Sequence, residues 1–161
     1  MKSLARGVLV ALLVAGAAPA VAGPYEDALA AYDRADYPAA LRLYRTAAEQ
    51  GHPLAQVQLG MMHAFARGTT RNYVEAVRLY RMAAEQGDTY AFTLLGTMYA
   101  RGLGVDADPV RGDMWLSLAA DRVPARAVDR DELEATLTFA QRDKAHEMAA
   151  ACERSNFKEC F

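Results

Sequence analysis

The sequence has little of what many common functions require. It contains only two cysteines and one tryptophan, and its formal net charge is −2. Nucleic-acid binding needs an excess of basic side chains to neutralise phosphates, so this balance argues against a polyanionic partner. The chain has no Gly-rich loop followed by Lys and Ser/Thr, and no Gly-x-Ser-x-Gly motif. We therefore expect no cofactor and no catalytic residues.

The chain also lacks an apolar run long enough to span a bilayer. Lys2 and Arg6 precede an apolar stretch at 8–18, and residues 20–22 read Ala-Val-Ala. This is the pattern of a cleaved export signal, and a stretch of about eleven apolar residues is well short of the roughly 20 that a spanning helix needs. We predict a signal peptide at 1–22, no membrane span after its removal, and a periplasmic or secreted protein.

Potential metal ligands are scarce as well. His146 and Glu147 begin like the helix of a zinc protease, but Ala150 stands where that motif needs its second histidine. Cys152 and Cys160 are too few for a structural zinc site and too far apart for a Cys-x-x-Cys redox pair. We predict no metal site, and we expect the two cysteines to form a disulfide, as a lone pair in an exported protein usually does.

What the sequence does contain is an internal repeat. The segment ALRLYRTAAEQG, which begins at Ala40, returns with few changes as AVRLYRMAAEQG, which begins at Ala76, 36 residues later. The same spacing relates Gly60 to Gly96. A period in this range is typical of stacked-repeat proteins, in which one helical pair buries its apolar face only against a neighbouring pair.

Helical signals recur in register with the repeat. Apolar residues follow helical spacing in both copies, and no stretch alternates as a strand would. The residues expected to cap the second helices share the 36-residue spacing, namely Asp36, Asn72 and Asp108. Gly51 and Gly87 are expected to end two of the helices. We predict an all-α stack of antiparallel helical hairpins over residues 23–123.

The C-terminal region departs from the repeat. Asp129 with Glu132, and Thr138 with Gln141, have the spacing of capping boxes. They predict helices near residues 130–136 and 139–154. Because the terminal unit of a stack must present a polar outer face, we expect residues 124–161 to form a helical cap that carries the disulfide.

These repeats resemble the Sel-one-like repeat, an α-hairpin module related to the tetratricopeptide repeat. The resemblance covers about residues 25–123 and is carried by Leu95, Gly96, Tyr99, Gly102, Gly104, Val105, Ala83 and Ala84. The first copy departs from the pattern, because His63 stands where the family has tyrosine and the following loop lacks the Gly-x-Gly-Val form. The resemblance implies a right-handed α-solenoid that binds partners on its concave face.

Two functions remain open. We expect an exported scaffold that binds a protein or peptide, in envelope assembly or secretion; the alternative is a cell-wall or β-lactam-binding or -hydrolysing enzyme. Some cysteine-rich exported relatives are associated with penicillin binding, but their repeats carry cysteine pairs that both repeats lack here. If the concave face binds a partner, residues off the packing stripes are expected to contact it, namely Gln56, His63, Tyr90, Phe92 and Thr97.

Overall fold

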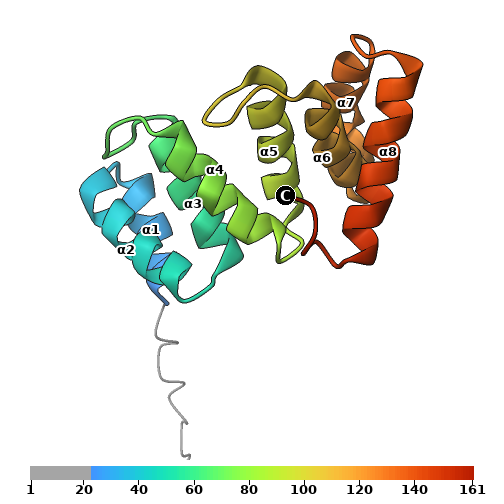
Figure 1. Ribbon diagram of the computed structural model, residues 1–161. Coiled ribbons are helices and arrows are strands. Elements are labelled where there is room, and N and C mark those ends of the chain that lie inside the picture. Colours follow the sequence, from blue (N-terminus) through green and yellow to red (C-terminus); the bar gives the residue numbers. More distant parts are fainter. Residues whose placement is uncertain (1–22) are drawn as a thin grey trace, which may run out of the picture.

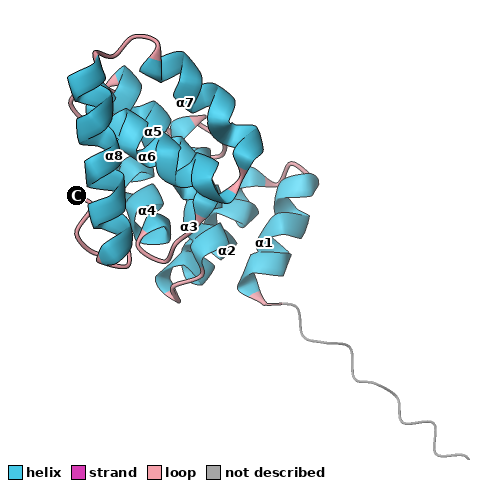
Figure 2. Ribbon diagram, turned by 90° about the vertical axis from the view of Figure 1, so that its right-hand side faces the viewer, coloured by secondary structure: helices cyan, strands magenta, loops and turns pink. Residues whose placement is uncertain are grey.

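The computed structural model describes residues 23–161, and the predicted signal peptide lies outside this part of the chain. Within it the secondary structure is entirely helical, with no strand (Figure 2). The α-helices are α1 (Pro24–Asp33), α2 (Tyr37–Glu49), α3 (Pro53–Ala64), α4 (Tyr73–Ala84), α5 (Thr89–Arg101), α6 (Pro109–Arg122), α7 (Ala127–Glu134) and α8 (Phe139–Arg154). Among residues 23–161, no helix combines the length and apolar character that a membrane crossing requires.

The first six helices pair as consecutive hairpins, α1 with α2, α3 with α4 and α5 with α6, and these hairpins stack side by side (Figure 1). The predicted all-α stack of hairpins is therefore confirmed. The second helix of each hairpin begins at a predicted cap. The carboxylate or amide oxygens of Asp36, Asn72 and Asp108 accept hydrogen bonds from backbone N–H groups three residues later, at 3.1, 3.0 and 2.9 Å. Each bond satisfies a donor that the first helical turn leaves free.

The mid-helix glycines allow the two helices of a hairpin to pack closely. A β-carbon placed on Gly60 of α3 would lie 2.5 Å from the Tyr80 ring of α4. A β-carbon on Gly96 of α5 would lie 2.6 Å from the Leu116 side chain of α6. Both positions therefore exclude any larger residue unless the helices move apart. This contact explains why a residue that weakens helices recurs in the repeat.

The buried side chains form two clusters. The first joins α1, α2 and α3 around Tyr44 and Met62. The second runs from α3 to the C-terminus and includes Phe92 and Trp115, neither of which is exposed at all. Because the second cluster also contains Cys152 and Cys160, the last residues of the chain belong to the core of the repeat stack.

The segment after α6 covers the end of the stack. Both α7 and α8 pack against α6. Helix α8 begins at Thr138 with both halves of the predicted capping box, and Cys152 and Cys160 form the predicted disulfide. The prediction for α7 was wrong at its start. Pro124 begins a 3-10 turn, Pro124–Arg126, that leads directly into α7, so Asp129 lies within the first helical turn rather than capping it.

Candidate functional site

Two hollows lie between successive hairpins, and they are equivalent under the 36-residue repeat. The first has a volume of about 290 Å³, and its polar lining includes Arg45, His63, Asn72 and Glu75. The second has a volume of about 700 Å³, and its lining includes Arg81, Tyr99, Asp108 and Arg111, which occupy the matching positions one repeat later. Since α4 lines both hollows, we treat them together and call them the repeat groove.

In the first hollow a carboxylate is held by an arginine. Arg78 donates two hydrogen bonds to Glu75, at 2.9 and 2.6 Å, and this pairing lowers the pKa of the Glu75 carboxyl. Because the Arg78 side chain is largely exposed, the pair fixes the position of the carboxylate more than it stabilises the fold. Burial lowers the pKa of His63, and its Nδ1 has no hydrogen-bond partner within the described residues.

In the second hollow two arginines flank one aromatic ring. Arg81 donates a hydrogen bond to the Tyr99 hydroxyl, and the Arg111 guanidinium lies 5.4 Å from the centre of the Tyr99 ring. The Nε atoms of both arginines are buried and have no hydrogen-bond partner within residues 23–161, although Arg111 Nε lies 3.7 Å from Asp108 Oδ2 as an ion pair. Two guanidinium groups with unused donors suit a carboxylate, which can accept two parallel hydrogen bonds from one arginine.

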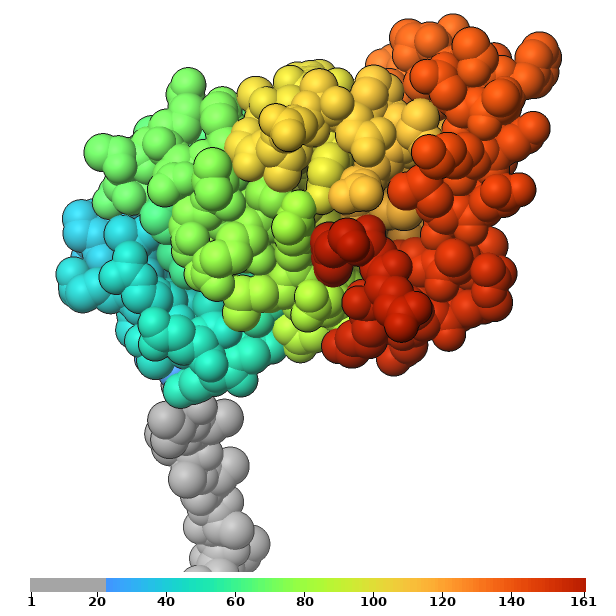
Figure 3. All heavy atoms as spheres, in the orientation of Figure 1, coloured from blue at the N-terminus to red at the C-terminus, as the bar shows by residue number. Residues whose placement is uncertain are grey.

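The chain's own C-terminus lies against this second hollow. The Phe161 ring is 5.3 Å from the Trp115 ring, and the Arg81 guanidinium lies 5.2 Å from the Phe161 ring centre. Lys158 donates a hydrogen bond to the backbone oxygen of Glu85 on the α4 side. Figure 3 shows these last residues, in dark red, seated in a recess between α4, the loop before α6, and α8. The recess thus already holds a short segment that ends in an aromatic residue.

Two of the five predicted contact residues are buried in the core, so the prediction was wrong for them. Phe92 has no exposed surface and packs between the rings of Trp115 and Phe157, at 5.5 and 5.2 Å. Gln56 is 1% exposed; its side chain donates to the Ala48 backbone oxygen and accepts from the Gln86 side chain. Both residues hold adjacent helices together and have no surface to offer a partner.

The other three residues lie in different places. His63 lines the first hollow of the groove. Tyr90 is 38% exposed and carries the Arg126 guanidinium 4.9 Å from its ring centre. Thr97 borders a separate hollow that α7 covers, with Glu132 and Leu133 opposite it. The structure therefore does not bring the five residues together as one surface.

The groove arginines did not stand out in the sequence, where basic and acidic residues alternate as on any solvated helix face. One signal could have found them. Arg45 and Arg81 occupy identical positions in the two copies of the repeat. Arg45 is exposed and Arg81 is half-buried, and neither belongs to the core, so the repetition indicates a shared role in the groove lining.

The comparisons with known proteins agree with this architecture. The Sel1 repeat family matches residues 26–52, 53–88 and 91–122, more than half of the chain. No curated protein matches the sequence. Sel1 repeats generally mediate protein binding, and proteins built from them are typically scaffolds without enzymatic activity.

Two solved structures resemble this one. A protective antigen of uropathogenic Escherichia coli strains, which displays an SLR fold, superposes with a TM-score of 0.75 at 28% identity, over 83% of this chain and 31% of that one. A Sel1 repeat protein from Oxalobacter formigenes superposes with a TM-score of 0.65 at 28% identity, over 83% of this chain and 56% of that one. This chain thus spans about a third and about half of the lengths of these two proteins. With three matched repeats, stacked as hairpins, two of which have helices in close contact at Gly60 and Gly96, the chain belongs to the Sel1 repeat family.

Proposed function

We propose that this protein is an exported scaffold that binds a protein or peptide partner in the repeat groove, in envelope assembly or secretion. The repeat family supports protein binding in general. The groove is the proposed binding surface, because its two hollows repeat the same layout with polar and cationic side chains. His63 is the one residue of the five predicted contacts that belongs to this site.

The partner's contacting group is a carboxylate, either a side chain or a chain terminus. The observation that carries this proposal is the pair of guanidinium groups, those of Arg81 and Arg111, beside Tyr99 in the lining of the second hollow. Arg111 has one carboxylate near it, Asp108, at 3.7 Å, and a carboxylate of the partner would add hydrogen bonds from the guanidinium groups. Tyr99 lies between the two guanidinium groups and offers an apolar face beside them. Aromatic rings and arginines are the residues that most often anchor interfaces.

We also propose that the scaffold acts outside the cytoplasm and that residues 124–161 serve as its terminal cap. The Cys152–Cys160 disulfide supports an oxidising compartment. The sequence pattern of residues 1–22 supports export. The cap proposal is supported by the polar residues that α7 and α8 present outward, with only Ala145, Ala149 and Cys152 buried on α8.

The enzymatic alternative has little support in the described residues. Ser155 and Lys158 have Ser-x-x-Lys spacing, but the Ser155 hydroxyl donates to the Cys152 backbone oxygen and the Lys158 amine to the Glu85 backbone oxygen. The cysteine pairs of the penicillin-binding relatives have no counterpart in these repeats, since Cys152 and Cys160 follow them. A nitrocefin hydrolysis assay on the purified protein tests this alternative directly. We expect no hydrolysis above that of a buffer blank.

The scaffold proposal can be tested by crosslinking within the groove. A photo-crosslinking residue at position 106, in the lining of the second hollow, should capture a partner from periplasmic extract, to be identified by mass spectrometry. Replacing Arg81 and Arg111 together by alanine should reduce that capture at least tenfold, corresponding to about 1.4 kcal/mol or more. Arg42→Ala is the matched control, because Arg42 is an exposed arginine of α2 outside the groove lining. Equal capture by the double variant and the control would place the binding surface elsewhere.

A further inference from the structure

The third hairpin has a carboxylate where the other two have apolar residues. Leu41, Val77 and Asp113 occupy the same repeat position. Val77 is buried in the larger core cluster, and Leu41 packs against the smaller one, so both positions face apolar surroundings. Asp113 has no exposed surface, and neither of its carboxylate oxygens has a hydrogen-bond partner within residues 23–161. Buried carboxylates in proteins are normally paired or bound to a metal, so this one needs a partner.

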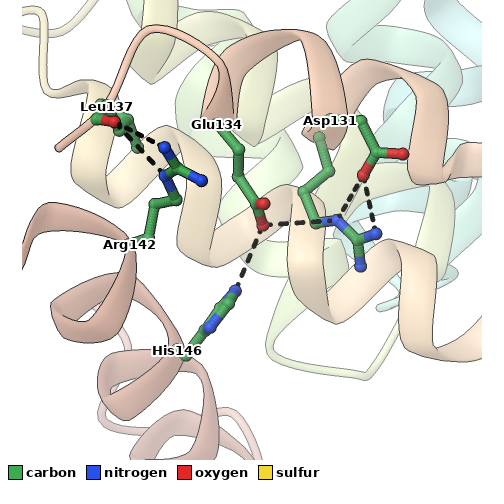
Figure 4. A network of polar contacts seen from close by, with 6 residues as sticks. Asp131, Glu134, Leu137, Arg142 and His146 are labelled. Carbon is green, nitrogen blue, oxygen red and sulfur yellow. Dashed lines mark hydrogen bonds and ion pairs between the residues drawn. The ribbon is translucent and has the colours of Figure 1, made fainter. Parts of the chain in front are cut away.

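The segment after the repeats brings two further ligand groups to Asp113. Glu134 comes from the end of α7 and His146 from the middle of α8, while Asp113 lies on α6. One ligand atom from each of the three lies within 4.8 Å of the other two. Figure 4 shows Glu134 and His146 pointing toward each other, with His146 Nε2 3.2 Å from Glu134 Oε1. Three helices thus each bring one ligand atom to the same small region.

We propose that Asp113, Glu134 and His146 bind one divalent cation, zinc, which joins α6, α7 and α8. Imidazole nitrogen and carboxylate oxygen are both ordinary zinc ligands, and zinc binds about 2.0–2.2 Å from each. Two carboxylates neutralise its charge, and one imidazole favours zinc over calcium or magnesium, which prefer oxygen ligands alone. Water would complete the coordination, since the chain supplies three ligands.

The cations near the site have partners of their own. Arg130 donates to Asp131 at 2.7 Å and lies 3.5 Å from Glu134. Arg130 would therefore keep Asp131 as its ion-pair partner if Glu134 bound a metal. Arg142 donates twice to the backbone oxygen of Leu137, at 3.3 and 3.1 Å. Neither arginine hydrogen-bonds to Asp113. Burial, with a smaller contribution from the Glu134 charge, raises the pKa of the Asp113 carboxyl to about 6, as expected for a buried carboxylate that no cation contacts.

The site can be reached from solvent. A hollow of about 280 Å³ opens beside His146 and is lined by Ser117, Asp121, Arg130 and Glu153 as well. The His146 side chain is 53% exposed, whereas that of Glu134 is 20% exposed. A hydrated cation can therefore approach through His146 and exchange water for the two less exposed carboxylates.

Zinc binding to the purified protein, prepared without a histidine tag, tests the proposal by isothermal titration calorimetry. We expect one zinc per chain and a rise in melting temperature with zinc. Asp113→Asn keeps the size of the side chain but removes its charge, and His146→Ala removes an exposed ligand without disturbing the core. Each should weaken zinc binding at least tenfold. Cobalt substitution gives an independent readout, because cobalt held by these ligands should show visible absorption bands that the His146→Ala variant loses.

Two matched controls show whether binding belongs to this cluster. Glu132→Gln changes an exposed carboxylate on the same helix as Glu134, and His63→Ala removes a histidine that lies in the groove. Both should bind zinc as the wild type does. The proposal is overturned if the wild type binds no zinc, or if His146→Ala binds zinc as tightly as the wild type. If Asp113→Asn does not fold, circular dichroism will show it, and the His146→Ala result decides alone.

Discussion

At the residue scale, Phe92 and Tyr90 lie two positions apart on α5 and have opposite surroundings. Phe92 is enclosed by Trp115, Phe157 and the Arg122 guanidinium, whereas Tyr90 is partly exposed beside Arg126. Side chains two apart on a helix point in different directions, so one faces the core and the other the rim. The two aromatic residues therefore contribute very differently to stability.

Replacing Phe92 by alanine should reduce the free energy of unfolding by about 3–5 kcal/mol, because it leaves a cavity in the larger core cluster. Tyr90→Ala should cost less than about 1 kcal/mol, as most surface substitutions do. Urea denaturation followed by circular dichroism measures both values. Similar losses for the two variants would contradict the difference in burial described above.

His63 should make stability depend on pH. Burial holds the folded-state pKa of His63 below its usual value; Arg45 and Arg78 act in the same direction, and Glu75 opposes them. The unfolded chain therefore takes up a proton at a higher pH than the folded chain does. His63 therefore leaves the free energy of unfolding unaffected above its unfolded-state pKa of about 6.5. As the pH falls below that value, the free energy of unfolding decreases.

The matched variant is His63→Tyr, which places at position 63 the residue type found one repeat later at Tyr99. The free energy of unfolding of the wild type should fall more steeply than that of His63→Tyr between pH 7.5 and pH 5.5. Parallel pH profiles for the two proteins would mean that the pKa of His63 is the same in the folded and unfolded chains. The comparison also cancels the contributions of other titrating groups, which both proteins share.

At the element scale, the disulfide holds the end of α8 and the residues after it against the repeats. Cys152 is the last buried residue of α8, and Cys160 precedes the Phe161 ring that packs on Trp115. The bond therefore controls whether the C-terminal segment stays in its recess. Because Trp115 is the sole tryptophan, its fluorescence reports on this contact.

Reducing the disulfide should destabilise the protein by about 2–3 kcal/mol, the chain-entropy value for a loop of this size. It should also shift the Trp115 emission to longer wavelength, because Phe161 then leaves the tryptophan ring exposed to water. Thermal melts and fluorescence with and without reductant measure both effects. A double variant, Cys152→Ala with Cys160→Ala, should not respond to reductant; a response in that variant would mean that the shift has another cause.

The helices themselves could largely be predicted from the sequence, because their signals are local. Each cap residue lies within three positions of the backbone group that it bonds, so spacing alone located Asp36, Asn72 and Asp108. The start of α7 was missed because two local signals competed. Pro124 turns the chain at once, and that turn continues into the helix before the capping pattern at Asp129 is reached.

The candidate site was less accessible to prediction, because it depends on contacts between distant segments. Phe92 is buried partly by Phe157, which lies beyond three further α-helices and is held there by the disulfide. The repeat period does not reveal this contact. Similarly, which face of α4 meets the next hairpin depends on how the helices cross, so the position of Arg81 in the groove required the three-dimensional structure.

At the scale of the whole molecule, each hairpin contacts mainly its neighbours. Stacks of this kind tolerate added or removed units, because every junction between hairpins is similar. This chain spans 31% and 56% of the two solved structures that it resembles. Three hairpins have two junctions between them, and each junction holds one hollow of the repeat groove.

The C-terminal segment breaks this neighbour-only pattern, and this affects the order in which the molecule folds. The hydrogen bond from Lys158 to Glu85 joins residues 73 positions apart, whereas the hairpins form from residues close in sequence. Contacts between distant residues are slow to form, and synthesis from the N-terminus delays this one until residue 158 has been made. Until then Phe92 lacks its contact with Phe157, and Trp115 lacks its contact with Phe161. Chains that lack residues 157–161 should thus be more open to proteases and aggregation than the chain that has them.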